Sequence, residues 1–448
     1  MVDLAQYQIG GSTAREIAAS AEALIREGTL DVGDALPTVR ALATAVGTSP
    51  ATVSSAYRTL RERGFVVADG RRGTRVAPRP PLRAPPRGTL PTRPVPARGD
   101  LSIGLADPAL LPPLAPALAR IDLESKLGIP RLESPDPDLL DVAARSFADD
   151  GVPAEALAIV SGAMDGVERV LQAHLRLGDR VVVEDPLYPP IRDVLLALGL
   201  VPVPVAVDDL GLIPELLQAA MAGGVEAVVA VPRAQNPFGA AFDERRSSDL
   251  RALLEQWPDV LLVEDDHASI VAGAPFRSLT SGSRPRWAVI RALSKALHPD
   301  MRIALAAGDP TTIARVEGRQ ALGPRWVSHI LQATAAELLR DPGFESIATR
   351  ARDTYSARRQ ALIEALSQHG VGAHGRSGLN VWVPVREEDP VVRALLDAGW
   401  LVAPGERFRC ATGPGIRVTT ATLDESDAAE VAEVIAIVQR AGRPRRAY

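Results

Sequence analysis

A proline-rich segment divides this chain and sets the first limit on its fold. Residues 77–98 contain eight prolines and five arginines in 22 positions. Proline cannot donate to the hydrogen-bond ladder of a helix or sheet, and the arginines of this segment cannot form a core. We therefore predict an extended linker in polyproline II geometry, able to span up to roughly 70 Å at about 3.1 Å per residue. The chain must then fold as two parts, one on each side of the linker.

Charge is distributed unevenly between these parts. From Arg40 to Arg98 the sequence has twelve arginines, no lysine and two acidic residues, a sum of +10, whereas the whole chain carries −5. The remaining residues must therefore sum to −15. A basic block near the N-terminus of an acidic protein indicates a module that binds a polyanion, joined to one that does not.

The overall composition is that of a folded protein without a disulfide framework. Hydrophobic residues make up 46% of the chain and charged residues 23%, both ordinary values. The single cysteine, Cys410, excludes an intrachain disulfide and fits a reducing cytoplasm. No apolar stretch reaches the ~18 residues of a membrane span, and acidic residues interrupt the region where a signal peptide would lie. We expect a cytoplasmic protein with no membrane partner, and we assign no residues to a metal site.

Helical patterns fill the part before the linker. Apolar residues at helical spacing predict three helices, over residues 14–26, 36–46 and 49–63. Ser49 suits the N-cap of the third helix, and Pro50 suits its first helical position. Glycines between these patterns predict short turns, as in a helix-turn-helix.

A basic hairpin follows the third helix. Residues 65–76 predict two short strands joined by a turn, which completes a winged helix-turn-helix. The third helix would lie in the DNA major groove, and the arginines would mainly contact phosphates. The alternative is a helical dimerisation module. The residues expected to contact DNA are Arg40, Ser49, Thr52, Ser54, Ser55, Arg58, Arg71 and Arg72.

This part resembles the GntR family of bacterial regulators. The resemblance rests on a combination of motifs, which are Leu36-Pro37-Thr38-Val39-Arg40, the run from Ser49 to Tyr57, Arg61-Glu62-Arg63-Gly64-Phe65, and Gly70 to Val76. In that family an arginine often follows the serine that starts the recognition helix, whereas Pro50 follows here. The resemblance implies binding to a double-stranded DNA operator, with base readout that differs from the usual one.

The body after the linker alternates strand patterns with helical segments. Such alternation predicts an α/β fold with a mostly parallel sheet, and sheets of this kind bind ligands at the carboxyl ends of their strands. The apolar runs of strand length are residues 157–160, 180–183, 201–207, 227–231, 260–263, 287–290 and 303–306.

Polar residues follow several of these runs, where a ligand would bind. Gly162 opens a helix after the first run, and a helix N-terminus suits a phosphate because its backbone N–H groups are free. Tyr188 follows the second run and could stack on a flat ring. Asn236 follows the fourth run and could donate to a phenolic oxygen. Asp265 follows the fifth, where a buried carboxylate could keep a pyridine nitrogen protonated. Each signal alone is equally typical of an ordinary loop.

Lys295 follows the sixth run, and it is one of only two lysines beside 48 arginines. Arginine cannot lose its proton in a protein and so cannot attack a carbonyl, whereas a lysine amine can form an imine. Genome composition could explain the scarcity of lysine, and Lys295 alone would be an ordinary surface residue. The order of polar residues at successive strand ends favours the chemical role.

In this order the residues resemble fold type I pyridoxal-phosphate aminotransferases across most of the body. The resemblance implies that Lys295 forms the internal aldimine and that Asp265 pairs with the pyridine nitrogen. Arg417, in Gly415-Ile416-Arg417-Val418, falls where the family carries the arginine for a substrate carboxylate. The other residues implied to contact the cofactor are Gly162, Ala163, Met164, Tyr188, Asn236, His267, Ser294 and Arg302.

Two positions depart from the family's pattern. His267 stands for a tyrosine that contacts the 3-oxygen of the cofactor, and Ala292 stands for a serine or threonine that binds its phosphate. Histidine could replace the hydrogen bond with a different reach and pKa, but alanine could not. The stretch 126–147 also matches the family poorly. These departures bear on cofactor affinity and turnover rather than on the fold.

A winged helix, a linker and an aminotransferase-like body together resemble the MocR subfamily of GntR regulators. The expected domains are a winged helix-turn-helix over 1–76, a linker over 77–98 and a pyridoxal-phosphate-binding body over 99–448. Within the body we expect a large domain at about 99–330 and a small one at about 340–448. The resemblance implies a head-to-tail homodimer, in which the DNA-binding domain of one subunit crosses to the body of the other.

Three functions are compatible with these parts. The favoured one is a transcriptional regulator whose body binds pyridoxal phosphate through Lys295 and responds to the cofactor or to a small amino compound that reacts with it. The second is an active pyridoxal-phosphate-dependent aminotransferase with an attached DNA-binding domain, whose turnover would consume its own effector. In the third, a body without cofactor serves only as a dimerisation scaffold.

Overall fold

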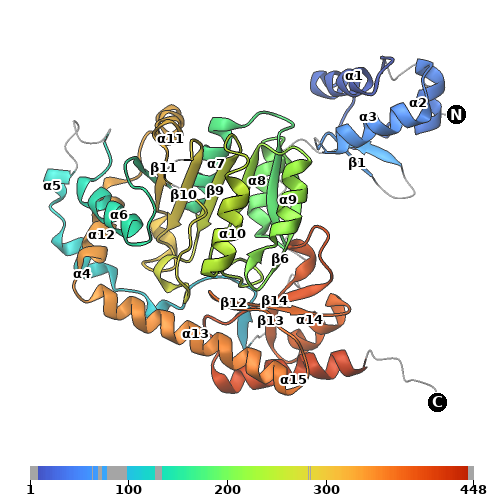
Figure 1. The fold of residues 1–448 in the computed structure, drawn as a ribbon. Coiled ribbons are helices and arrows are strands. Elements are labelled where there is room, and N and C mark those ends of the chain that lie inside the picture. The colour runs from blue at the N-terminus through green and yellow to red at the C-terminus, as the bar shows by residue number, and fades with distance from the viewer. Residues whose placement is uncertain are drawn as a thin grey trace. The chain divides into compact units, whose positions relative to one another are not determined.

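A computed structural model describes residues 9–62, 64–68, 73–77, 98–126, 134–280, 282 and 284–441. Two compact units make up these residues. One holds the N-terminal elements, drawn in blue in Figure 1, together with residues 176–179 and 193–202, and the other holds the remaining elements from residue 98 onward. The linker expected over 77–98 lies almost entirely outside the described residues.

The N-terminal unit contains, within the described ranges, three helices and a two-stranded antiparallel hairpin. This is the predicted winged helix-turn-helix, with helix bounds within a few residues of those expected. Its elements are α1 (Ala14–Glu27), α2 (Val39–Val46), α3 (Pro50–Glu62), β1 (Val66–Ala68) and β2 (Thr74–Val76).

Helix caps and one buried core define this unit. The Thr13 side chain accepts a hydrogen bond from the Glu16 backbone, and the Glu16 side chain reaches back to Thr13, so α1 begins in a capping box. Gly47 ends α2 at φ 69°, a left-handed conformation that glycine adopts without strain. The apolar faces of the helices meet in the core, where the Tyr57 hydroxyl donates to the Pro37 carbonyl at 2.8 Å. These contacts fix α3 against α2.

The large domain of the body is built on a mixed sheet. In the described residues the strand order is β4-β11-β10-β9-β8-β5-β6-β7. Strands β5, β8, β9 and β10 are parallel, as predicted, but β11 runs antiparallel to both β10 and β4. The strands are β4 (Leu157–Val160), β5 (Arg180–Asp185), β6 (Val201–Asp208), β7 (Gly211–Leu212), β8 (Ala227–Ala230), β9 (Leu261–Asp266), β10 (Trp287–Ala292) and β11 (Ala304–Gly308).

Several helices of the large domain pack against this sheet, as Figure 1 shows, and buried side chains of helices and strands form the main core. Within the described ranges, none of the helices is long and apolar enough to cross a membrane. The helices are α4 (Leu114–Arg120), α5 (Leu123–Lys126), α6 (Pro137–Asp149), α7 (Ala163–His174), α8 (Pro189–Ala197), α9 (Pro214–Ala222), α10 (Glu244–Leu254), α11 (Pro310–Leu322) and α12 (His329–Arg340), and the 3-10 turns are η3 (Pro108–Leu110), η5 (Ser269–Val271) and η6 (Pro299–Met301).

The small domain has its own sheet and its own core. Its strand order, for the residues described, is β12-β14-β13-β3. Helix α13 joins the two domains, because Tyr355 belongs to the large core and Leu362 belongs to the small one. The elements are β3 (Gly99–Leu101), α13 (Phe344–Gln368), β12 (Asn380–Pro384), α14 (Glu388–Asp397), β13 (Trp400–Pro404), η7 (Gly405–Arg407), β14 (Gly415–Thr419) and α15 (Glu425–Ala441).

Strand β3 belongs to a different domain from the one expected. We expected the large domain to begin at about residue 99, but β3 pairs in parallel with β13 and thus belongs to the small sheet. Leu101 is buried in the small core. The chain therefore enters the small domain first, directly after the linker, and then passes into the large domain.

Candidate cofactor pocket and DNA-binding face

The polar residues predicted at the strand ends surround one cavity of the body, with a volume of about 260 Å³. The substrate candidate Arg417 also lines it, as does Ala292. Every predicted cofactor residue except Gly162 lines this cavity, that is Ala163, Met164, Tyr188, Asn236, Asp265, His267, Ser294, Lys295 and Arg302. Residues that lie up to 139 positions apart in the sequence, from Ala163 to Arg302, are thus brought together near the carboxyl ends of the parallel strands, and Arg417 joins them from β14 (Gly415–Thr419) of the small sheet.

One end of the cavity suits an anion. Gly162 is the N-cap of α7 at φ 94°, and a Cβ atom there would lie 3.1 Å from Nη2 of Arg302. The guanidinium group therefore lies against the glycine, beside the free N–H groups at the start of α7. A helix N-terminus and an arginine together form a site for a phosphate group. Ser294 adds a hydroxyl group to the lining.

Asp265 provides a buried carboxylate on the cavity wall. Its side chain is 2% exposed, and its Oδ1 atom has no hydrogen-bond partner among the described residues. Burial raises the pKa of Asp265 to about 7, and the nearby charge of Asp266 raises it further, while Lys295 opposes the shift. A buried carboxylate oxygen without a partner is costly, so this position is suited to a ligand that brings an N–H group or a positive charge.

Lys295 is the nucleophile candidate of the cavity. Its Nζ atom donates a hydrogen bond to the Gly104 carbonyl. Burial lowers the pKa of Lys295 to about 8, with a further lowering by the charge of Arg417 and an opposing effect of Asp265. About a tenth of the amine is therefore neutral at pH 7, far more than in an ordinary lysine, and the neutral amine is the form that attacks a carbonyl.

Arg417 is fixed at the cavity by three contacts. Its Nη1 donates to Oδ1 of Asn236 at 3.3 Å, and its Nη2 donates to the Ser102 carbonyl. The guanidinium group also stacks over the Phe408 ring, 4.8 Å from the centroid. Its buried Nε has no partner in the described residues. The group is thus positioned for a carboxylate, although part of its hydrogen-bonding capacity is used by the protein.

The segment 102–105 is a part of the site that the sequence did not reveal. Ile103, Gly104 and Leu105 line the cavity, and Ser102 and Gly104 provide carbonyls to Arg417 and Lys295. These contacts are made by the backbone, so no side-chain motif marks them. The only signal is the alternation of the apolar residues Ile103 and Leu105, which are about half exposed.

His267 and Ala292 both line the cavity, where the departures from the family were expected to matter. The Nε2 atom of His267 lies 2.7 Å from the Ala234 carbonyl. Burial lowers the pKa of His267 to about 4, and Lys295 adds to this, so the ring is neutral near pH 7. A neutral ring that donates from Nε2 to a carbonyl has only an acceptor left at Nδ1. It therefore does not supply the donor of the tyrosine it replaces, and Ala292 supplies no polar group.

The predicted DNA-contacting residues of the N-terminal unit lie at its surface. Arg40, Ser49, Ser54 and Arg58 are exposed, and Thr52 and Ser55 are half-buried. Ser49 also caps α3 as predicted, because Thr52 N donates to Ser49 Oγ at 3.1 Å and the two hydroxyls lie 2.8 Å apart. Arg58 Nη2 donates to Ser55 Oγ at 3.3 Å. Arg71 and Arg72 lie outside the described residues.

Two family models match the chain. Residues 13–76 match the family of bacterial regulatory proteins called gntR, and residues 139–435 match aminotransferase class I and II. The second match covers more than half of the chain. The two matches fall on the N-terminal unit and on the body respectively, in the order expected from the sequence.

Individual relatives and solved structures agree with these matches. The chain is 38% identical over 421 residues to the vitamin B6 salvage pathway transcriptional repressor PtsJ of Salmonella typhimurium, covering 94% of this chain and 96% of the relative. It is 28% identical over 360 residues to the pyridoxine biosynthesis transcriptional regulator PdxR of Corynebacterium glutamicum, covering 77% and 76%. The kynurenine aminotransferase of Pyrococcus horikoshii shares the fold, with a TM-score of 0.71, 22% identity and coverage of 77% and 91%.

Proposed function

Because the chain belongs to the MocR subfamily of GntR transcriptional regulators, we propose that pyridoxal phosphate is the signal to which it responds. The protein would bind DNA through α3 and regulate genes of vitamin B6 metabolism. This proposal rests on the observation that Lys295 and Asp265 line the same cavity as the anion-binding end. The names of the two relatives, a repressor of vitamin B6 salvage and a regulator of pyridoxine biosynthesis, support the choice of signal.

The residues of the cavity fit pyridoxal phosphate group by group. Arg302, Ser294 and the N–H groups at the start of α7 would hold the phosphate, and Asp265 would accept the N–H of the pyridine ring. Tyr188 would stack on the ring. When bound, the cofactor supplies an aldehyde that a lysine amine can capture. Lys295, with its lowered pKa, would provide that amine.

Capture would change the bonds of the segment that connects the body to the linker. In the structure, Lys295 and Arg417 donate to the carbonyls of Gly104 and Ser102. If the Lys295 amine held the cofactor, it would no longer be free to donate to the Gly104 carbonyl. Residues 102–105 follow β3, which follows the linker directly. We infer that this segment transmits occupancy of the cavity to the DNA-binding unit, because its contacts would differ between the two states.

An absorption titration combined with DNA binding tests the proposed function. Addition of pyridoxal phosphate to the purified protein should produce a visible band from the bound cofactor and should change the affinity for the DNA upstream of its own gene. A protein that stays colourless at saturating cofactor would contradict the proposal. Conversion of the band by amino acids, with recovery by keto acids, would instead support an aminotransferase.

The rate of cofactor capture should depend on pH with a midpoint near 8. Only the neutral amine attacks the aldehyde, and the pKa of Lys295 is lowered to about 8. The rate should therefore rise as pH increases through this value and level off above it. Stopped-flow absorbance between pH 6 and pH 10 measures the profile. A rate that keeps rising to pH 10 would show an ordinary lysine pKa and would argue against the structure of the site.

Binding to DNA should weaken with salt, and Arg58 should contribute one phosphate contact. Arg58 is exposed on α3, where the recognition helix would face DNA. Arg58→Ala should lower the slope of log affinity against log salt concentration by about 1. Fluorescence anisotropy on a labelled duplex measures this slope. The matched control is Arg245→Ala on α10 of the body, where the arginine side chain is 91% exposed. A slope that is unchanged in Arg58→Ala but reduced in the control would contradict the proposed interface.

We also propose that the protein acts in the cytoplasm as a homodimer with exchanged DNA-binding domains. The N-terminal unit carries a single recognition helix within the described residues, and winged-helix and helix-turn-helix proteins commonly pair two such helices on two half-sites. Sedimentation of the full chain with and without its DNA measures the assembly.

A further inference from the structure

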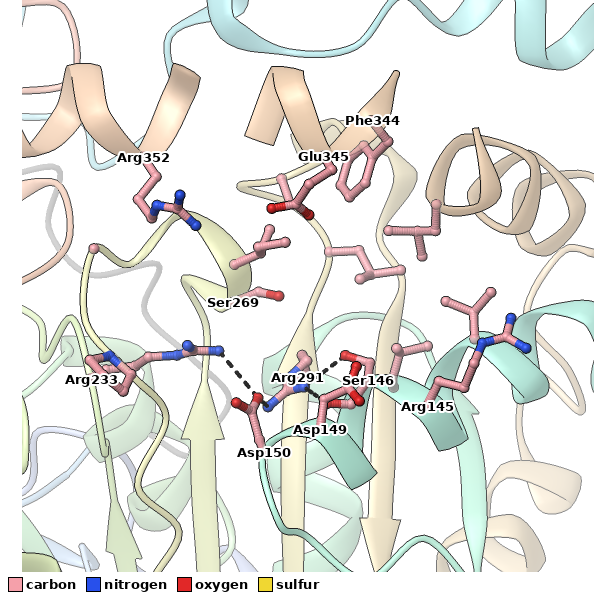
Figure 2. A pocket seen from close by; sticks show the side chains of 18 of the residues that line it. Arg145, Ser146, Asp149, Asp150, Arg233, Ser269, Arg291, Phe344, Glu345 and Arg352 are labelled. Atoms are coloured by element: carbon pink, nitrogen blue, oxygen red, sulfur yellow. Dashed lines mark hydrogen bonds and ion pairs between the residues drawn. The ribbon is translucent and has the colours of Figure 1, made fainter. Parts of the chain in front are cut away.

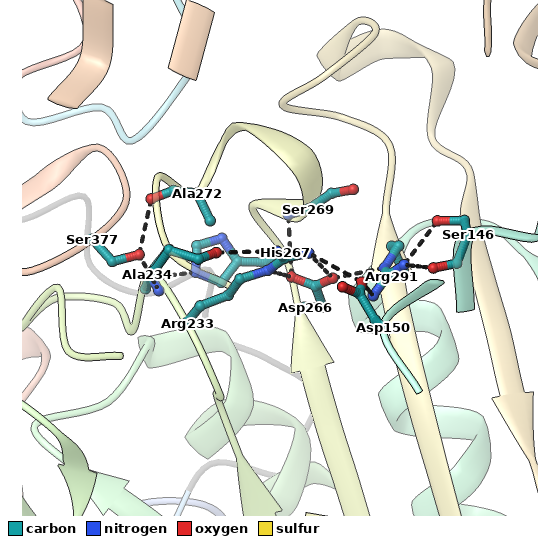
Figure 3. A network of polar contacts seen from close by, with 11 residues as sticks. Ser146, Asp150, Arg233, Ala234, Asp266, His267, Ser269, Ala272, Arg291 and Ser377 are labelled. Carbon is teal, nitrogen blue, oxygen red and sulfur yellow. Dashed lines mark hydrogen bonds and ion pairs between the residues drawn. The ribbon is translucent and has the colours of Figure 1, made fainter. Parts of the chain in front are cut away.

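Behind the cofactor pocket lies a buried cluster of two arginines around Asp266. Figure 3 shows Arg233 and Arg291 converging on this carboxylate at the end of β9. Asp266 is 0% exposed, and both arginines are buried. The neighbouring Asp265 lines the cofactor pocket, and successive residues of a strand point to opposite faces. The cluster therefore supports β9 from the face opposite the pocket.

The geometry of the cluster is tightly defined. Arg233 donates from Nε to Oδ1 and from Nη2 to Oδ2 of Asp266, both at 2.8 Å. Arg291 donates from Nε to Oδ2 at 2.7 Å. The backbone N–H of Ser269 adds a fourth bond at 3.2 Å. These charge-assisted bonds hold Asp266 ionised, and its pKa lies well below the usual range because of the two guanidinium groups, despite its burial.

The arginines are in turn fixed by groups from other elements. Arg291 donates to the Ser146 carbonyl and hydroxyl, both at 2.7 Å, and its Nη2 lies 2.5 Å from Oδ2 of Asp150. Both guanidinium groups lie over the Phe276 ring, 5.2 and 5.1 Å from its centroid. They line a second cavity of about 870 Å³, which Figure 2 shows. The end of α6 and the loop near residue 276 thereby brace the cluster.

Each residue of the cluster is a close sequence neighbour of pocket residues. Arg233 precedes Ala234, whose carbonyl binds His267, and Asp266 lies between Asp265 and His267. Arg291 precedes Ala292 in the segment that leads to Lys295. Three separate segments of the pocket are thus tied together from behind by one ionic cluster. A displacement of any member would move side chains on the pocket face.

We propose that Arg233, Asp266 and Arg291 are positioning residues for pyridoxal phosphate, which align Asp265 and Lys295 and set the electrostatic potential at the cofactor. This inference rests on the proposed function, because it requires that the cofactor binds in the pocket. A role in stability alone would not explain the placement, since a buried ion pair is often no more stabilising than apolar residues of the same volume.

The negative charge of Asp266 and the positive charge of Arg291 should shift the pH titration of the bound cofactor in opposite directions. A negative charge near the captured amine favours its protonated form, and a positive charge disfavours it. Asp266→Asn should therefore shift the pH midpoint of the visible absorption change of bound cofactor downward by about half to one unit. Arg291→Gln should shift the same midpoint upward by a similar amount. Other charged or titratable groups also lie near Asp265 and Lys295, and neither variant replaces any of them. They are Glu184, Tyr188, His267, Arg302 and Arg417.

A spectroscopic pH titration of the holoprotein tests this inference. We expect midpoints in the order Asp266→Asn, wild type, Arg291→Gln, together with a cofactor dissociation constant raised on the order of tenfold in both variants, which is about 1.4 kcal/mol. Loss of packing alone would weaken binding in both variants but would not move the midpoints in opposite directions. Midpoints equal to that of the wild type, in variants that bind cofactor, would overturn the inference while leaving the proposed function intact. Failure of the wild type to bind cofactor would instead reject the proposed function.

Two further variants keep the test decisive. Arg145→Gln removes another arginine that lines the second cavity but makes no contact with Asp266, and it should leave both readouts unchanged. If Asp266→Asn does not fold, Arg291→Lys is compared with Arg291→Gln. Lysine retains the charge and should restore the wild-type midpoint, whereas equal midpoints in the two variants would overturn the inference.

Discussion

Replacement of Lys295 by alanine should abolish covalent capture of pyridoxal phosphate and, with it, the response of DNA binding to the cofactor. Arginines cannot substitute for the amine, because they do not lose their protons. The cofactor could still bind through its phosphate and ring, but reduction with borohydride should then attach nothing to the protein. In the wild type, the same treatment should reduce the imine and leave one phosphopyridoxyl group on the peptide that contains residue 295, the aldehyde oxygen having left as water.

The chain offers a matched control for this experiment. Lys126 is its only other lysine, so Lys126→Ala removes the same chemical group elsewhere. This variant should keep the visible band, the mass label at residue 295 and the cofactor-dependent change in DNA affinity. If Lys295→Ala retained the label, or if its DNA affinity still followed the cofactor, the assignment of Lys295 would be wrong.

Much of this pocket could be predicted from the sequence because its side chains follow apolar strands. The carboxyl ends of parallel strands meet at one edge, so the order of Gly162, Asn236, Asp265 and Lys295 along the chain predicts their proximity. All four lie in or beside the same cavity. Periodicity also predicted α1 to α3 and the wing, because helices and strands with one buried face repeat their apolar residues regularly.

Other features depend on contacts between distant residues and leave no local pattern. The pairing of β3 with β13 requires a partner that lies about 300 positions away in the chain. The direction of β11 was equally hidden, because an apolar run has no orientation. The backbone carbonyls of Ser102 and Gly104 bind pocket side chains without any sequence motif.

The charged residues of the buried cluster could not be predicted from the sequence either. Arg233 and Arg291 are two of 48 arginines, and although each lies just after an apolar run, no local pattern distinguishes them from arginines at the surface. Asp265 and Asp266 are adjacent and chemically identical. Only the alternation of faces along β9 directs one to the cofactor pocket and the other to the arginines. The two carboxylates then have opposite pKa shifts, one raised and the other lowered.

Asp265→Ala should therefore weaken cofactor binding while it stabilises the protein without cofactor. The carboxylate is buried, and its Oδ1 atom has no partner in the described residues, so its removal relieves an unfavourable group. With cofactor present, the variant loses the acceptor for the ring N–H group. A charged hydrogen bond contributes about 1.5–3 kcal/mol, and the dissociation constant should accordingly rise by roughly ten- to hundredfold.

The stabilisation should also depend on pH, in a direction fixed by the pKa shift. The pKa of Asp265 is raised from 3.8 to about 7 in the folded protein. Between these values the native state binds more protons than the unfolded state, so this residue lowers the stability of the wild type as pH rises, until the effect levels off above about 7. The melting temperature of Asp265→Ala should thus exceed that of the wild type more at pH 8 than at pH 5.

A variant at a second buried carboxylate tests whether the expected stabilisation is specific to Asp265 or follows from the loss of any buried acid. Asp309 is buried as well, but it accepts hydrogen bonds from Trp287 N, Thr312 N and the Thr312 hydroxyl. Asp309→Ala should lower the melting temperature and leave cofactor affinity unchanged, the reverse of Asp265→Ala. A cofactor-free Asp265→Ala protein that melts below the wild type at pH 8 would mean that the carboxylate is satisfied without a ligand. That result would remove the physical reason for placing the pyridine ring against it.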